Sequence, residues 1–178
     1  MARVRTQTRK TKAQVKKILN DLPGYVSGRK RDTYRVRKVF WSVFTHELYR
    51  QIHIGFVAKS IGGTDDQGES WLDIRDSTKR RKGRNEILQH TEKLRQSLKP
   101  GTVSGDAYAK KNRDQIVEYI FGNKRVVYGS KLPYAKHNHE GTNRIPARRL
   151  WPENLEEWVG RATAKAIAAV VTHLTRVI

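Results

Sequence analysis

Apolar side chains recur every three or four positions along two long stretches of the chain. The first set comprises Val36, Phe40, Val43, Phe44, Leu48, Ile52 and Phe56. This spacing predicts a core-facing α-helix that begins near Asp32 or Thr33, both good N-caps, and ends at about Ala58. The second set comprises Leu155, Trp158, Val159, Ala162, Ala166, Ala169, Val170, His173 and Leu174. It predicts a long C-terminal helix that opens at Glu153 or Asn154, with acidic residues in its first turn, where they suit the helix dipole.

Strand signals lie between the two long helices. Residues 115–121 and 124–128 are rich in β-branched and aromatic residues, and Gly122-Asn123 between them favours a tight turn, so they predict a β-hairpin. Residues 102–109 have a weaker strand tendency. The pattern of strands between helices predicts an α+β fold, in which an antiparallel β-sheet of about four strands packs against the long N-terminal helix and the long C-terminal helix.

Shorter elements complete the pattern. Residues 85–98 predict a second helix, and residues 132–140 predict a short helix or turn. Residues 144–151 are predicted to be extended, because Pro146 disfavours the helical conformation in the residue before it. Residues 61–68 are rich in glycine and acidic residues and predict a flexible, solvated loop, in which Asp65-Asp66 has no catalytic role.

The 178 residues suit one domain and a basic extension. Residues 1–24 predict a basic N-terminal arm with a short helix over residues 11–19, ended by Pro23-Gly24, and residues 25–178 predict a single α+β domain. Residues 166–171 form the longest apolar stretch, which is too short to cross a bilayer, and no apolar core follows the basic N-terminus as in a secretory signal. We therefore expect a protein made inside the cell, with no membrane partner.

The charge of the chain is strongly and unevenly positive. Lys and Arg number 37 against 17 Asp and Glu, a formal net charge of +20, and residues 1–38 alone hold 13 basic and two acidic residues. Such clusters attract polyanions through Coulomb forces and counterion release. The candidate contacts to DNA or to an acidic protein partner are Arg3, Arg5, Arg9, Lys10, Lys79, Arg80, Arg81, Lys82 and Arg84. A solvated basic arm without a nucleic-acid role is an equally good interpretation.

Catalytic signatures are sparse. The chain has no cysteine, which excludes disulfides, cysteine-ligated zinc, iron–sulfur clusters and a thiol nucleophile. The string His137-Asn138-His139 spells HNH, but neighbours along a chain rarely converge on one ion, so exposed or interface histidines are the better interpretation. His46 and His53 are predicted to be ordinary helix residues. We expect no cofactor and no enzymatic activity, with a metal nuclease at His137 and His139 as the enzymatic alternative.

Several short motifs occur in a characteristic order. They are Trp71-Leu72 followed by Thr78, Thr91-Glu92-Lys93-Leu94-Arg95-Gln96-Ser97, Tyr128-Gly129-Ser130, Tyr134-Ala135 six residues before Gly141-Thr142, and Ile145-Pro146-Ala147-Arg148. This order resembles the phage virion morphogenesis, or tail completion, family of tailed bacteriophages, over about residues 70–152. The chain departs from the family pattern at Glu92, where glycine is usual, and at His137, which is offset by one position.

The resemblance implies a structural virion protein at the head–tail interface, a neck, tail completion or tail terminator protein, assembled in the host cytoplasm. It implies a homo-oligomeric ring, a hexamer, whose partners are other neck, connector and tail proteins and the double-stranded DNA that passes through the channel. The candidate subunit-interface residues are Tyr134, Arg144, Ile145, Pro146, Ala147, Arg148 and Arg149.

The residue types of the Ile-Pro-Ala-Arg motif independently suit an interface. Pro146 fixes an extended entry, Ala147 permits close approach, and Arg148 and Arg149 offer planar guanidinium groups to carboxylates of a neighbouring subunit. In the simpler alternative, Arg148 is a surface residue and the motif only orders the chain before the last helix. For the protein as a whole, the alternative function is a stand-alone basic nucleic-acid-binding protein that uses residues 1–38 and 79–84.

Overall fold

The predicted α+β fold class is confirmed. The computed structural model describes residues 20, 33–73, 80, 92–120, 125–151 and 155–177. Its elements are α2 (Thr33–Ser60), α4 (Lys93–Ser97), β1 (Thr102–Ser104), β2 (Ala107–Ala109), β3 (Gln115–Ile120), β4 (Arg125–Ser130), α5 (Pro133–Glu140) and α6 (Glu156–Val177). Both long helices form where the apolar periodicity predicts them, and α5 matches the predicted short helix over residues 132–140.

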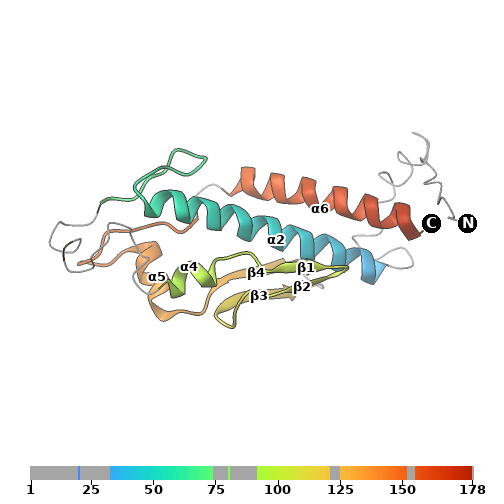
Figure 1. Cartoon of the computed structure of the whole chain (residues 1–178), viewed down its shortest axis with the longest axis horizontal. Helices are drawn as coiled ribbons and strands as arrows, with labels where there is room; N and C mark the ends of the chain where they lie inside the picture. Colours follow the sequence, from blue (N-terminus) through green and yellow to red (C-terminus); the bar gives the residue numbers. More distant parts are fainter. Residues whose placement is uncertain are drawn as a thin grey trace, which may run out of the picture.

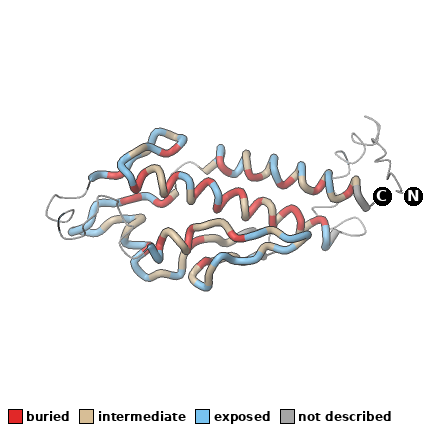
Figure 2. Tube along the Cα trace, in the orientation of Figure 1, coloured by how far each residue is buried: buried red, intermediate tan, exposed pale blue. Residues whose placement is uncertain are grey.

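Helix α2 is the central element, with other elements packed on two of its sides (Figure 1). Helix α6 runs antiparallel along one side, and the strands and α4 lie against the other side. Buried positions therefore occur around most of α2, whereas burial on α6 is confined to one stripe (Figure 2). Polar side chains such as Ser42, Thr45 and Gln51 on α2 are buried for the same reason. Most of the predicted apolar stripe of α6 faces the core, but Val159 is exposed.

The two long helices approach closely because small residues lie at their crossing. Gly55 of α2 lies under the indole of Trp158, such that a Cβ atom at position 55 would be 3.4 Å from the ring. Ala162 and Ala166 follow Trp158 on the same buried stripe of α6. At the other end of the interface, Phe40 and Phe44 stack with ring centroids 6.1 Å apart. Burial of these apolar side chains supplies the main stabilisation of the helix pair.

The predicted antiparallel strands form, and they divide into two sheets of two strands each. Strand β1 pairs with β2, and β3 pairs with β4. The side chain of Gln115, which is fully buried, joins the two hairpins without a backbone ladder between them. Its Oε1 accepts hydrogen bonds from the Tyr108 hydroxyl (3.2 Å) and the Lys111 N–H (3.1 Å), and its Nε2 donates to the Lys99 carbonyl (2.8 Å).

Polar side chains of α2 attach the hairpins to the helix. The Tyr49 hydroxyl donates to the Ile116 carbonyl (2.5 Å) and accepts from the Gly129 N–H (2.9 Å), so one side chain contacts both β3 and β4. His46 Nδ1 donates to the Gly101 carbonyl at 3.0 Å. His46 and His53 both lie within α2, as predicted, and the hydrogen bond of His46 has a structural role.

Some predicted elements fall outside the described residues. These are the basic arm, apart from Asn20, together with its short helix, the hairpin turn at Gly122-Asn123, and the opening of the last helix at Glu153 or Asn154. Of the helix predicted over residues 85–98, the described part is α4, which is shorter. Helix α2 ends at Ser60, two residues beyond the predicted end.

Candidate subunit interface

The connection between α5 and α6 consists of an exposed loop and an anchored segment. We call residues 142–147, which are all exposed, the tip, and residues 148–151 the stem. Gly141 makes the sharp exit from α5 with φ 81° and ψ 176°, and a Cβ atom there would come within 2.7 Å of the Ala147 nitrogen. The tip closes on itself through the Thr142 N–H to the Ile145 carbonyl (2.8 Å) and the reverse bond (3.2 Å). Only glycine suits this backbone conformation.

Three hydrogen bonds hold the stem in place. The Arg148 N–H donates to the Asn138 carbonyl (2.7 Å), and the Leu150 N–H donates to His139 Nδ1 (3.0 Å). From the other side, the Trp71 indole N–H donates to the Arg149 carbonyl (2.9 Å). Leu150 itself is fully buried. The stem is therefore fixed to α5 and to the loop that follows α2, and it supports the tip from beneath.

His139 has a defined structural role in this support. Because its Nδ1 accepts from the Leu150 N–H, the neutral ring carries its proton on Nε2. The ring stacks on Trp151, with centroids 4.2 Å apart. Burial lowers the pKa of His139 from its usual value, and nearby Arg149 and Lys59 act in the same direction, against Glu140 and Glu69. His139 is thus a hydrogen-bond acceptor that requires the neutral form.

The loop after α2 corrects one prediction. The sequence predicts a flexible, solvated segment over residues 61–68, but Asp65 is buried and its carboxylate lies 3.0 Å from the ammonium of Lys59, which is fully buried. Asp65 also accepts the backbone N–H groups of Gln67 and Glu69, each at 3.0 Å. The loop residues alone give no sign of this partner, because the cation comes from the last turn of α2.

The same loop is attached to α6 by its exposed carboxylate. Asp66 accepts from the Trp158 indole N–H (3.0 Å) and forms an ion pair with Arg161. The loop therefore connects the C-terminal end of α2, the first turns of α6 and, through Trp71, the stem. The sequence pattern did not reveal these positioning roles of Lys59, Asp66 and Trp71, although Trp71 does belong to the motif order that carries the family resemblance.

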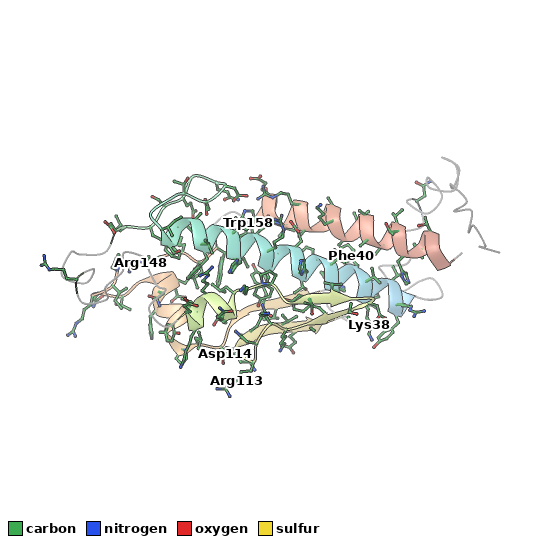
Figure 3. All side chains as sticks on the ribbon, in the orientation of Figure 1. Lys38, Phe40, Arg113, Asp114, Arg148 and Trp158 are labelled. Atoms are coloured by element: carbon green, nitrogen blue, oxygen red, sulfur yellow. The ribbon has the colours of Figure 1, made fainter. Side chains whose placement is uncertain are left out.

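The structure separates the predicted interface residues into two groups. Tyr134, Arg144, Ile145, Pro146, Ala147 and Arg149 are exposed. Ile145 is 39% exposed, although its side chain is large and apolar. Arg148 is only 7% exposed, which rules out the alternative that it is a surface residue. Figure 3 places it near the C-terminal end of α2, far from Lys38 and Phe40 near the other end.

Of the predicted polyanion contacts, one lies in the described part of the chain. This residue, Arg80, is exposed, as a contact to a polyanion requires. The remaining residues lie outside the described part; they are Arg3, Arg5, Arg9, Lys10, Lys79, Arg81, Lys82 and Arg84.

No metal centre is found among the described residues. In that part of the chain, no group of three or more His, Cys, Asp or Glu side chains is placed to hold a metal ion. His137 is exposed, whereas His139 is half-buried and bound to the stem backbone. Likewise, none of the described helices is long and apolar enough to cross a membrane.

Comparison with known proteins provides no further assignment. The chain matches no protein-family model, no curated protein and no solved structure.

Proposed function

We propose that the chain is a structural protein of a tailed-phage virion, which forms a homo-oligomeric ring at the head–tail interface as a neck, tail completion or tail terminator protein. The observation that carries the proposal is the tip, six consecutive exposed residues that include Ile145 and Pro146, supported by a buried and hydrogen-bonded stem. This tip contains the Ile-Pro-Ala part of the motif that most specifically resembles the tail completion family.

The geometry of the tip suits docking. A loop already held in one conformation loses little conformational entropy when it binds, so more of its contact energy becomes affinity. The tip lies at one end of an elongated molecule, and the hairpins lie along another side (Figure 1). Contact between two different surfaces of successive copies is heterologous, and such contacts generate rings when the rotation closes.

The net charge of +20 agrees with this role. A ring that encloses DNA needs a surface that tolerates phosphate, and basic side chains also suit acidic protein neighbours. The mechanism is binding and shape, without turnover of a substrate.

The test combines the protein content of virions with a matched pair of variants. We expect mass spectrometry to detect the chain in purified particles of the phage that encodes it. In a complementation assay, Ile145→Asp should leave heads and tails unjoined in negative-stain images, because it places a charge at the centre of the tip. The control is Ile61→Asp, since Ile61 is 68% exposed but lies outside the tip, and it should yield joined particles. Particles that lack the chain, or full function of Ile145→Asp, would refute the proposal.

The net charge also favours a second candidate, a stand-alone nucleic-acid-binding protein. It predicts tight DNA binding by the isolated monomer, with an affinity that falls steeply as salt rises. Fluorescence anisotropy with duplex DNA at several salt concentrations measures this directly. Steep salt dependence together with absence of the chain from virions would favour this candidate over the ring.

A further inference from the structure

Arg148 is a buried cation to which the described residues supply no counter-charge. Its Nε is buried with no hydrogen-bond partner, and no ion pair to its guanidinium occurs in the described part of the chain. Burial lowers the pKa of Arg148, with no neighbouring carboxylate acting against the shift. Its backbone N–H donates to the Asn138 carbonyl (2.7 Å), so the donor without a partner is in the side chain.

Two other cationic side chains, on α2, have carboxylate partners. Lys59, which is fully buried, has the carboxylates of Asp65 at 3.0 Å and Glu69 at 3.6 Å. Arg50 is paired with Glu47 at 2.6 Å. A buried charge without a partner destabilises the folded subunit, because desolvation is not offset by an attractive interaction. An arginine kept in such a position by its surroundings is suited to a partner that arrives on assembly.

We propose that Arg148 is the receptor half of a carboxylate-binding site that an acidic side chain of a second copy of the chain completes. The inference rests on the proposed ring and specifies its contact. The two terminal nitrogens of a guanidinium form an end-on pair of donors, which matches the two oxygens of a carboxylate, whereas Nε is buried. The site lies directly behind the tip, whose exposed Ile145, Pro146 and Ala147 offer an apolar rim that a protein surface can cover.

The second copy has suitable exposed carboxylates. Glu92 precedes α4, which lies beside α5, and Glu118 lies on β3 (Figure 1). Because the tip and the hairpins lie on different sides of the molecule (Figure 1), a contact with Glu118 joins unlike surfaces, as a closed ring requires. The pairing also offsets the repulsion between copies that each carry a net charge of +20.

The decisive experiment is substitution of Arg148, which should leave the stability of the isolated chain unchanged or raised but should weaken association between copies. Arg148→Gln removes an unpaired buried charge, so the isolated full-length chain should melt at the same temperature as wild type or higher. Association between copies, measured by sedimentation at increasing concentration, should weaken about 100-fold. Arg35→Gln, at an exposed arginine of α2 outside the tip, is the control and should change neither quantity. A lower melting temperature for Arg148→Gln, or unchanged association, would overturn the inference.

The source of the carboxylate is tested separately. Double-mutant cycles combine Arg148→Gln with Glu92→Gln and with Glu118→Gln, and we expect non-additive losses of association for one of the two pairs. Additive losses for both would overturn the assignment to a second copy. A photo-crosslinker in place of Ala147 should also join two copies of the chain within particles, and crosslinks only to another protein would contradict it.

The two proposals fail in different ways. If purified particles lack the chain, the proposed function fails, and melting and sedimentation of the purified chain still decide the role of Arg148. If particles contain the chain and Arg148→Gln assembles as wild type, only the role of Arg148 is refuted.

Discussion

The stem beneath the exposed tip depends on the protonation state of one ring nitrogen, Nδ1 of His139. This Nδ1 accepts the Leu150 N–H at 3.0 Å, and protonation of that nitrogen would remove the acceptor. Burial holds the pKa of His139 below its usual 6.5, so the folded protein favours the neutral ring. An unfolded chain takes up the proton first as the pH falls, so stability is fully present above about pH 6.5 and decreases as the pH falls below it.

The His139 prediction compares two neighbouring histidines. His139→Asn retains an acceptor oxygen near the position of Nδ1 and removes the titration, so the loss of melting temperature between pH 7.5 and pH 5 should be smaller than in wild type. His137→Asn removes an exposed histidine of the same helix and should keep the wild-type pH dependence. Differential scanning calorimetry at both pH values measures the two slopes. Equal slopes for His139→Asn and wild type would contradict the assignment.

His53 contributes in the same direction, and both variants retain it. Burial lowers the pKa of His53, and the positive charges of Arg95 and Lys99 lower it further. The contribution of His53 to the stability of the folded state therefore also decreases as the pH falls. The comparison between His139→Asn and His137→Asn therefore isolates His139 against an unchanged background.

The α5–stem unit depends on the backbone at Gly141. The exit from α5 combines a positive φ of 81° with a space into which a Cβ atom would come within 2.7 Å of the Ala147 nitrogen. Both conditions exclude a side chain, and both arise because the tip folds back over the end of the helix. The stem hydrogen bonds to Asn138 and His139 require that return path.

Substitution at two glycines separates backbone strain from collision. Gly62 has φ 85°, and a Cβ atom there would have no neighbour within 4 Å, so Gly62→Ala should lower the free energy of unfolding by about 1–2 kcal/mol, the strain alone. Gly141→Ala adds the collision and should lower it by about 3 kcal/mol or more. Urea denaturation measures both free energies. Hydrogen exchange at the Arg148 and Leu150 amides should rise in Gly141→Ala only; equal losses for the two variants would show that the return path is not constrained.

The arrangement of the molecule follows from the central position of α2. One of its sides receives α6 and another receives the hairpins, so the long helix organises every described layer. The crossing of α2 and α6 depends on Gly55 under Trp158. The same crossing positions the loop at Asp66, which binds both Trp158 and Arg161, and thus the Trp71 contact to the stem. The exposed tip is in this way connected to the packing of the helix pair.

Glycines on the two helices provide a matched test of this crossing. Gly55→Leu should lower the free energy of unfolding by about 1–3 kcal/mol, because the side chain overfills the contact with Trp158 and Asp65. Gly160 lies exposed on α6 with nothing within 4 Å of a Cβ, so Gly160→Leu should raise stability by about 0.5–1 kcal/mol through helix propensity. Urea denaturation at constant pH compares them. If Gly55→Leu is tolerated as well as Gly160→Leu, the crossing is looser than the structure indicates.

Local pattern sufficed for the elements. The periodicity of Val36 to Phe56 and of Leu155 to Leu174 predicted α2 and α6, because apolar residues that face the core of a helical protein recur at the helical period. The turn pair Gly122-Asn123 between β-rich stretches predicted the pairing of β3 with β4 for similar local reasons. The division into two sheets was not predicted, because strand propensity does not reveal that the side chain of Gln115, bonded to Lys99, Tyr108 and Lys111, joins the hairpins in place of a backbone ladder.

The residues of the candidate interface could be selected from the sequence, but the burial of individual side chains there could not. The order of short motifs predicted that Tyr134 and residues 144–149 form one functional group, and all of these residues except Arg148 are exposed. Identical residue types at positions 148 and 149 could not reveal that one guanidinium is buried and the other exposed. Burial of Asp65 likewise depended on Lys59, which arrives from the end of α2.

The amino-acid sequence by itself determined the helices, the strand-forming stretches, the net charge of +20 and the absence of cysteine chemistry, because each depends on neighbouring residues or on simple composition. Only the tertiary structure decided which charges are buried and which backbone carbonyls accept hydrogen bonds from the Trp71 and Tyr49 side chains. It also decided that the buried Nε of Arg148 lacks a partner among the described residues. The reason is physical: desolvation and hydrogen bonding are set by whatever segments meet at a point in space, and those segments lie far apart along the chain.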